Sequence, residues 1–363
     1  MRIILLLLTV LAGGGQVLPQ DPTRAGWEAI QRGDGDKAAA AFRSVLAQNP
    51  NDTRALAGAA LAAHLLGRDD DAVASLKRAL RIDPDYLYAS YLLGPLAYAQ
   101  GDLDLAIKSY EHIVKLAPGN RAIYQQLEDW KKEAALHKTF TVAPTARFTV
   151  MFEGPSQEAI AARVSQALDS AYSRVGRALQ SYPPQTVTAI LYTKEQFRDI
   201  TRSPSWAGGA YDGRIRIPVA GALNKPAELD RIVTHEYVHA VVQQLYPGVP
   251  RWLNEGLATF MEPGDHSWLT SKLRPDSLIP LARLNEAFQT ADGGDASVAY
   301  AEGYVTTRVL SERLGANFPV FLQYVSGGTP VDQALMLFSL SPADIEHEWT
   351  RQLRNSAASR ERK

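Results

Sequence analysis

The chain has 363 residues, and its 38 Lys and Arg residues against 39 Asp and Glu residues give a net charge of −1. This balance excludes a nucleic-acid binder that works through bulk positive charge. The absence of cysteine excludes disulfides, thiolate zinc fingers and cysteine nucleophiles, so any metal would have to be held by His and carboxylate side chains.

The first residues have the pattern of a secretory signal. Met1 and Arg2 precede an apolar run from Ile3 to Leu11, and small residues follow at 12–15. A membrane anchor is the alternative, but the run is well short of the roughly 20 apolar residues that a spanning helix needs. We therefore expect residues 1–18 to be a signal peptide, and the mature protein to be periplasmic or extracellular with no membrane span.

A repeat with a period of 34 residues follows. Pro, Gly, Ala and a bulky residue each recur at this spacing. The four sets are Pro50, Pro84, Pro118; Gly33, Gly67, Gly101; Ala38, Ala72, Ala106; and Phe42, Leu76, Tyr110. The glycine allows a tight turn between two helices, the alanine allows close helix packing, and the proline ends the second helix. The pattern resembles the tetratricopeptide repeat.

Three such units are expected at about 19–50, 53–84 and 87–118, with a capping helix at 120–136. Arrays of this kind present a concave surface to a peptide or protein, so a protein partner is expected on the repeat groove. Four tyrosines could contribute to that surface or could simply pack between helices. They are Tyr86, Tyr88, Tyr91 and Tyr98.

A change of pattern marks a second domain. Residues 137–146 break the helical pattern and are expected to form a linker. Beyond it, the residues at 147–153, 186–192 and 214–218 have strand patterns, and helical spacing covers 156–181 and most of the chain from Pro226. We expect an α+β domain at 147–355 after the all-α repeats, and a disordered tail at 356–363.

The second domain contains the motif His-Glu-Tyr-Val-His. His235 and His239 are four residues apart, so on a helix they lie on one face and can bind one ion. Glu236 stands next to the first histidine and can reach a water molecule at that ion. The alternative is a buried helix whose two histidines have this spacing by chance.

A third ligand is expected from the next helix. Catalytic zinc takes three protein ligands and keeps one open position. Glu255 lies one turn into a helix that begins after Pro250, so two antiparallel helices can direct His235, His239 and Glu255 to one Zn²⁺ per chain. Glu262 and His266 are rival ligands that rank below Glu255.

These residues resemble the gluzincin metallopeptidases, a thermolysin-like group with a His, His, Glu zinc site. The similar segments are His235–His239, Trp252–Ala258, Gly208–Ile215 and Ala299–Tyr304. Together they resemble bacterial peptidase MA-like domains, which are often joined to tetratricopeptide repeats. The resemblance implies that His235, His239 and Glu255 bind zinc and that Glu236 is the general base.

The sequence departs from the patterns of these families at two places. Thermolysin-like enzymes often carry an acidic residue four positions after the zinc glutamate, where it supports a ligand histidine, but this chain has Thr259 there. The support of the histidines must therefore differ. The Gly-Ala-Met-Glu-Asn signature of related aminopeptidases is replaced by Gly209-Ala210-Tyr211-Asp212, so an anchor for a substrate amino terminus is not expected.

Further expectations concern the reaction. Tyr300, and as second choice Tyr304, would donate a hydrogen bond to the developing oxyanion, although either could be a core tyrosine. By resemblance, the strand at 214–217 would be the sheet edge on which an extended peptide pairs. The favoured function is an exported zinc endopeptidase that acts on a protein or peptide. The alternative is a non-catalytic adaptor in which the zincin-like domain is structural.

Overall fold

The computed structural model describes residues 21–201, 209–219, 224–271, 273–275, 277–290 and 293–360. The expected signal peptide lies outside these described residues. The chain forms two compact units that meet in sequence between Lys132 and Glu133. Each unit is described here by itself.

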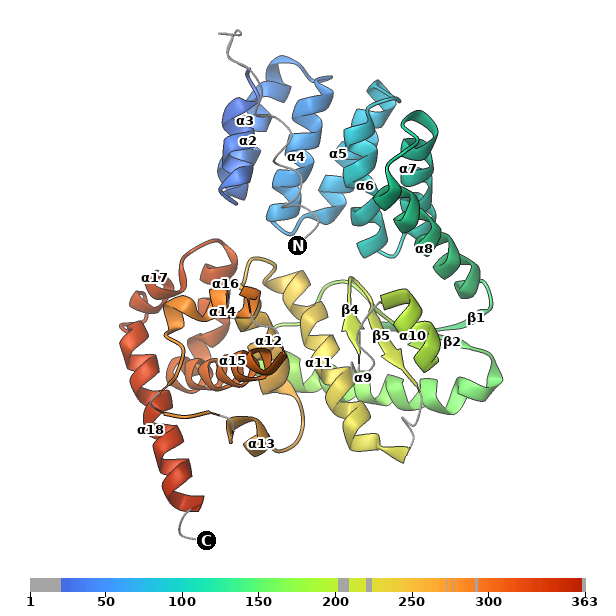
Figure 1. The fold of residues 1–363 in the computed structure, drawn as a ribbon. Helices are drawn as coiled ribbons and strands as arrows, with labels where there is room; N and C mark the ends of the chain where they lie inside the picture. Colours follow the sequence, from blue (N-terminus) through green and yellow to red (C-terminus); the bar gives the residue numbers. More distant parts are fainter. Residues whose placement is uncertain are drawn as a thin grey trace. The chain divides into compact units, whose positions relative to one another are not determined.

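The first unit consists of three helical hairpins, drawn in blue to teal in Figure 1. The helices are α2 (Arg24–Gln31), α3 (Gly35–Gln48), α4 (Thr53–Leu65), α5 (Asp69–Ile82), α6 (Leu87–Ala99) and α7 (Leu103–Leu116). Helix α8 (Arg121–His137) follows as the cap, and its last turn belongs to the second unit. The three repeat glycines stand at the hairpin turns with φ of 71°, 69° and 83°, a conformation that glycine adopts without steric cost.

Side chains at the repeat positions form the core of the first unit. Phe42, Leu76 and Tyr110 are buried, and the repeat alanines are completely buried beside them. Asp34 and Asp102 cap their helices through backbone amides, whereas Asp69 is the first residue of α5 and contacts His64 at 2.6 Å. The 34-residue pattern thus predicted both the turns and the core.

The four repeat tyrosines pack partly into the helical array. Tyr86, Tyr88 and Tyr91 are half-buried against the core of the repeats, and Tyr98 stacks on Trp130 with ring centroids 5.2 Å apart. Packing therefore accounts for much of the surface of each tyrosine.

The second unit is built on a five-stranded mixed sheet with the order β1-β2-β3-β5-β4. The strands are β1 (Phe140–Pro144), β2 (Phe148–Glu153), β3 (Val187–Tyr192), β4 (Ala210–Tyr211) and β5 (Ile215–Pro218). The strands β2, β3 and β5 are parallel, while β1 and β4 pair antiparallel at the two edges. This architecture confirms the α+β fold predicted for the second domain.

The alternation of side chains on β3 separates the two faces of the sheet. Ala189 and Leu191 join the main core, which α9 (Glu158–Leu179) and α11 (Pro226–Leu245) share on one face. Ile190 and Tyr192 join a smaller cluster with Phe197 of α10 (Lys194–Thr201) on the other face. The sheet is therefore covered by helices on both sides.

The rest of the second unit is helical (orange to red in Figure 1). Its helices are α12 (Arg251–Met261), α13 (Ser267–Thr270), α14 (Leu284–Thr290), α15 (Gly293–Leu314), α16 (Phe318–Ser326), α17 (Val331–Met336) and α18 (Pro342–Arg360). Helix α12 packs between α11 and α15. Short 3₁₀ turns at Pro155–Gln157, Leu281–Arg283 and Gly315–Asn317 connect neighbouring elements.

Three expectations from the sequence differ from this structure. Part of the expected linker is β1, whose backbone pairs with β2 from Phe140 to Pro144. Strand β5 is not the sheet edge, because the chain before the Asp212-Gly213 turn folds back on it as β4. Helix α18 continues to Arg360, beyond the point at which the disordered tail was expected, because Ala and Arg favour helix there.

A buried polar network lies in the second unit, where α8 ends against β3 and β5. The Arg216 side chain is fully buried and donates from Nη1 to Glu133 Oε1 at 2.8 Å and to the Tyr192 hydroxyl at 2.6 Å. Arg214 pairs with the same glutamate at 3.4 Å, and His137 Nε2 lies 2.7 Å from the Tyr192 hydroxyl. Burial lowers the pKa of His137 to about 4, so the imidazole is neutral.

Within the described residues, none of the helices combines the length and the apolar character that crossing a membrane requires.

Candidate metal centre

Two consecutive helices bring the motif residues together. Helix α11 carries His235 and His239 one turn apart, with their ring centroids 4.8 Å from each other. The turn at 246–250 reverses the chain, and α12 begins after Pro250, so that Glu255 faces the two histidines. Helix α11 is buried along most of its length, which holds the histidine-bearing face in place.

The donor atoms of these three residues converge on one point. Nε2 of His235 and Nε2 of His239 each lie 3.7 Å from Oε2 of Glu255. Among the described residues, these three form the group whose ligand atoms lie within 4.8 Å of one another. Tetrahedral zinc with bonds of about 2.0–2.1 Å separates its ligand atoms by about 3.4 Å, so the spacing fits zinc.

The hydrogen bonds on the far side of each ring fix the tautomer that coordination needs. His235 Nδ1 lies 2.7 Å from Oε1 of Glu262, and His239 Nδ1 lies 2.9 Å from Oδ1 of Asn254. Both oxygens are acceptors, so each Nδ1 carries the proton and each Nε2 lone pair is directed to the metal site.

Glu262 lies behind His235, on the side of the ring away from the three converging donor atoms. It follows the last residue of α12, and its second carboxylate oxygen accepts from Arg231 at 3.2 Å and lies 3.5 Å from His266 Nε2. Burial alone would raise the pKa of Glu262, but its hydrogen bonds with His235 and His266 lower it to about 2. The rival ligands Glu262 and His266 thus stand behind His235.

This geometry provides a carboxylate beside the first histidine, although position 259 is Thr259 and not an acidic residue. The carboxylate that supports the first histidine comes from seven residues after Glu255, at the end of α12, instead of from four residues after it. Two turns of helix place position 262 on nearly the same side as Glu255. Asn254 and Arg231 were missed in the sequence, and Glu262 was considered only as a rival ligand; proximity in sequence to the motif residues is the one signal that could have pointed to the first two.

We expect Glu262→Gln to weaken zinc binding about tenfold, because a neutral amide polarises His235 less than a carboxylate does. Competition with a chromogenic chelator would measure the dissociation constant. Glu158→Gln, at the exposed start of α9, is the matched control and should bind zinc like the wild type. Equal affinities for Glu262→Gln and wild type would contradict this role.

Glu236 lies beside the metal group in a buried position. The residue is only 7% exposed, and Gly209 at the start of β4 packs directly against its side chain. Burial raises the pKa of Glu236 to about 7, and the charges of Glu255 and Glu262 add to this effect while His235 opposes it. A carboxyl group with a pKa near neutrality is suited to both accepting and returning a proton.

The two candidate tyrosines occupy different places. Tyr300 of α15 is half-buried and lies close enough to Glu255 and Arg251 for their charges to act on it. Burial raises the pKa of Tyr300 to about 12, so its hydroxyl remains a neutral donor. Tyr304 is buried and stacks on His266 with centroids 4.9 Å apart, which places it behind the ligand histidine. The structure therefore brings Tyr300, rather than Tyr304, to the metal group.

Close packing of α12 on α15 fixes the position of Glu255. A Cβ atom on Gly256 would collide with the Thr307 hydroxyl and the backbone of Gly303. Only glycine therefore permits this approach of the two helices, and Gly256 sets how closely the neighbouring Glu255 lies to α15.

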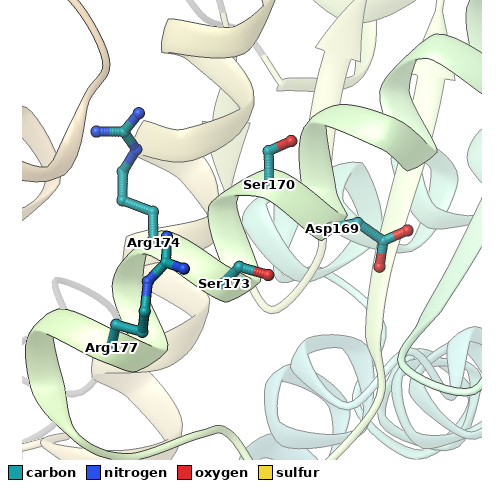
Figure 2. A pocket seen from close by; sticks show the side chains of 5 residues that line it. All are labelled: Asp169, Ser170, Ser173, Arg174 and Arg177. Atoms are coloured by element: carbon teal, nitrogen blue, oxygen red, sulfur yellow. The ribbon is translucent and has the colours of Figure 1, made fainter.

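A separate depression lies on the surface of α9. Figure 2 shows its lining side chains, all of which project from this one helix. They are Asp169, Ser170, Ser173, Arg174 and Arg177. The depression contains none of the metal-group residues, and one exposed helix face does not enclose a ligand.

The fold and the His-His-Glu group on adjacent helices define a zincin-like domain preceded by helical repeats. Residues 165–355, just over half of the chain, match the peptidase MA superfamily, and the chain belongs to that superfamily. Residues 23–86 and 70–121 match the tetratricopeptide repeat. Both assignments agree with the resemblance found in the sequence.

One of the solved structures that match is the first tetratricopeptide domain of Spaghetti (RPAP3) bound to the HSP90 peptide SRMEEVD. It is 21% identical, with a TM-score of 0.30, and the match covers 31% of this chain and 93% of that chain. No curated protein matches this chain significantly.

Proposed function

We propose that this protein is an exported zinc peptidase that hydrolyses internal bonds of a protein or peptide. The observation that carries this proposal is the convergence of His235, His239 and Glu255 beside the buried carboxyl group of Glu236. Membership in the peptidase MA superfamily supports the chemistry. The apolar run at 3–11 supports export.

Different residues of the chain would carry out different parts of the reaction. Zinc, when bound, supplies Lewis acidity that activates water and polarises the scissile carbonyl group. Glu236 accepts the proton of the attacking water and returns it to the leaving amine. The neutral Tyr300 hydroxyl donates to the carbonyl oxygen as negative charge develops on it.

The substrate backbone would pair with β4, the strand at the sheet edge beside Glu236. An edge strand accepts an extended chain on either side of the bond that is cut, which favours internal cleavage. The repeats would recruit the substrate or a protein partner through their groove.

The first test is the metal content of the purified protein, determined by elemental analysis. We expect about one zinc per chain in the wild type and none in His239→Ala, which loses one of three ligands. His347→Ala is the control, because His347 is exposed on α18 and far in sequence from the motif. A wild type without zinc after reconstitution would overturn the peptidase proposal and favour the adaptor.

A further inference from the structure

The edge strand beside Glu236 is very short. Strand β4 contains two residues, and its pairing with β5 is limited to Ala210 with Arg216 and Tyr211 with Ile215. The two side chains point to opposite faces, where each is half-buried. So short a strand needs additional contacts to keep a defined position.

The position of β4 matters for the site because it borders the general base. A Cβ atom at Gly209 would lie 2.8 Å from both Cγ and Oε1 of Glu236. A small displacement of β4 would therefore change the space beside that carboxyl group. It would also move the backbone groups to which a substrate pairs.

Asp212 ties the turn next to β4 to Arg216 of β5 and so to the buried network. The guanidinium Nε of Arg216 donates to Asp212 at 3.0 Å and 2.9 Å, across the turn that joins the two strands. The same guanidinium group is held at Nη1 by Glu133 and Tyr192. Because Arg216 is completely buried, it has few ways to move, and it is a rigid point of attachment for the hairpin.

We propose that Asp212 is a positioning residue: through Arg216 and Glu133 it holds the β4 edge in the register that substrate binding requires. The inference rests on the proposed peptidase function for its effect on substrate. Asp212 is 40% exposed at its side chain and Glu133 only 2%. Loss of Asp212 therefore leaves Arg216 of β5 paired inside the protein, while the turn next to β4 loses its bonds to that guanidinium group.

The test compares Asp212→Ala and Asp212→Asn with the wild type. For Asp212→Ala we expect KM for a peptide substrate to rise about fivefold with kcat nearly unchanged, since binding at the edge is impaired while the metal group is intact. Asp212→Asn keeps one acceptor oxygen, so its KM should lie between those of the wild type and Asp212→Ala. Zinc content should remain that of the wild type.

Amide hydrogen exchange gives a second readout that needs no activity. The amides of Ala210 and Tyr211 should exchange about tenfold faster in Asp212→Ala, while those of α11 are unchanged. Asp230→Asn is the matched control, because Asp230 also pairs with an arginine, Arg163, at similar exposure.

The outcomes separate the two proposals. Unchanged KM and unchanged exchange in Asp212→Ala, in a protein that cleaves peptide, overturn the positioning role alone. A wild type that neither binds zinc nor cleaves peptide overturns the proposed function, and the exchange experiment then decides the positioning role by itself. Loss of zinc in Asp212→Ala would also overturn the inference, because it would place the effect at the metal group.

Discussion

Glu236→Gln is expected to lower kcat for peptide cleavage by at least about 10³-fold while zinc remains bound at the wild-type level. General acid–base catalysis contributes about 10²–10⁴-fold, and this carboxyl group would serve twice in one cycle. Glutamine has nearly the same shape but cannot accept the proton of water. Single-turnover kinetics on a fluorogenic peptide, with zinc measured on the same sample, would test the expectation.

The control for this experiment is Glu228→Gln. Glu228 lies on the first turn of the same helix and is exposed, with a salt bridge to Lys225. We expect its kcat to stay within about twofold of the wild type, because surface substitutions of this kind have small effects. Undiminished cleavage by Glu236→Gln would contradict the role of Glu236 as general base.

The repeats were predictable because their signals are periodic and local. Turn glycines, packed alanines and bulky core residues recur every 34 residues, and each has a physical reason that one sequence displays. In the structure, the second hairpin consists of α4 (Thr53–Leu65) and α5 (Asp69–Ile82). A periodic pattern of this kind can be recognised without knowing which distant residues are in contact.

The metal ligands were predictable for a related reason. His235 and His239 are one helical turn apart, so local geometry alone places them on one face. The prediction of Glu255 required only the assumption that the next helix runs antiparallel to the first. The groups behind the ligands follow from tertiary packing instead: nothing in the sequence specifies that Glu262, at the end of α12, reaches His235.

The sheet edge was predicted wrongly because β4 is too short to show an alternating pattern. Its two residues belong to the sheet through the hairpin at Asp212-Gly213 and through contacts with distant elements. The partnership of Arg216 with Glu133 joins residues 83 positions apart, and no local pattern encodes it. In a strand, Arg216 would have been expected to face solvent, yet it is the most deeply buried charge of the described chain.

The buried network makes a strong prediction about stability. Glu133→Gln is expected to lower the free energy of unfolding of the second unit by about 3 kcal/mol, because it removes the buried anion that faces Arg216 and Arg214. Differential scanning calorimetry would measure the effect as a lower transition temperature for that unit. Glu128→Gln is the control on the same helix, since its pairing with Lys131 is exposed and worth little.

A double variant distinguishes charge compensation from hydrogen bonding as the source of this loss. In Glu133→Gln with Arg216→Met, the cation of Arg216 is removed along with its partner, so the cost of leaving that charge without its anion disappears, while Arg214 keeps its charge. We expect the double variant to be more stable than Glu133→Gln alone, even though it has lost more hydrogen bonds. It should nevertheless bind peptide poorly, because the bonds between Asp212 and Arg216 are lost and β4 is no longer held in register. A double variant that is less stable than either single variant would show that hydrogen bonding, and not charge compensation, holds the network together.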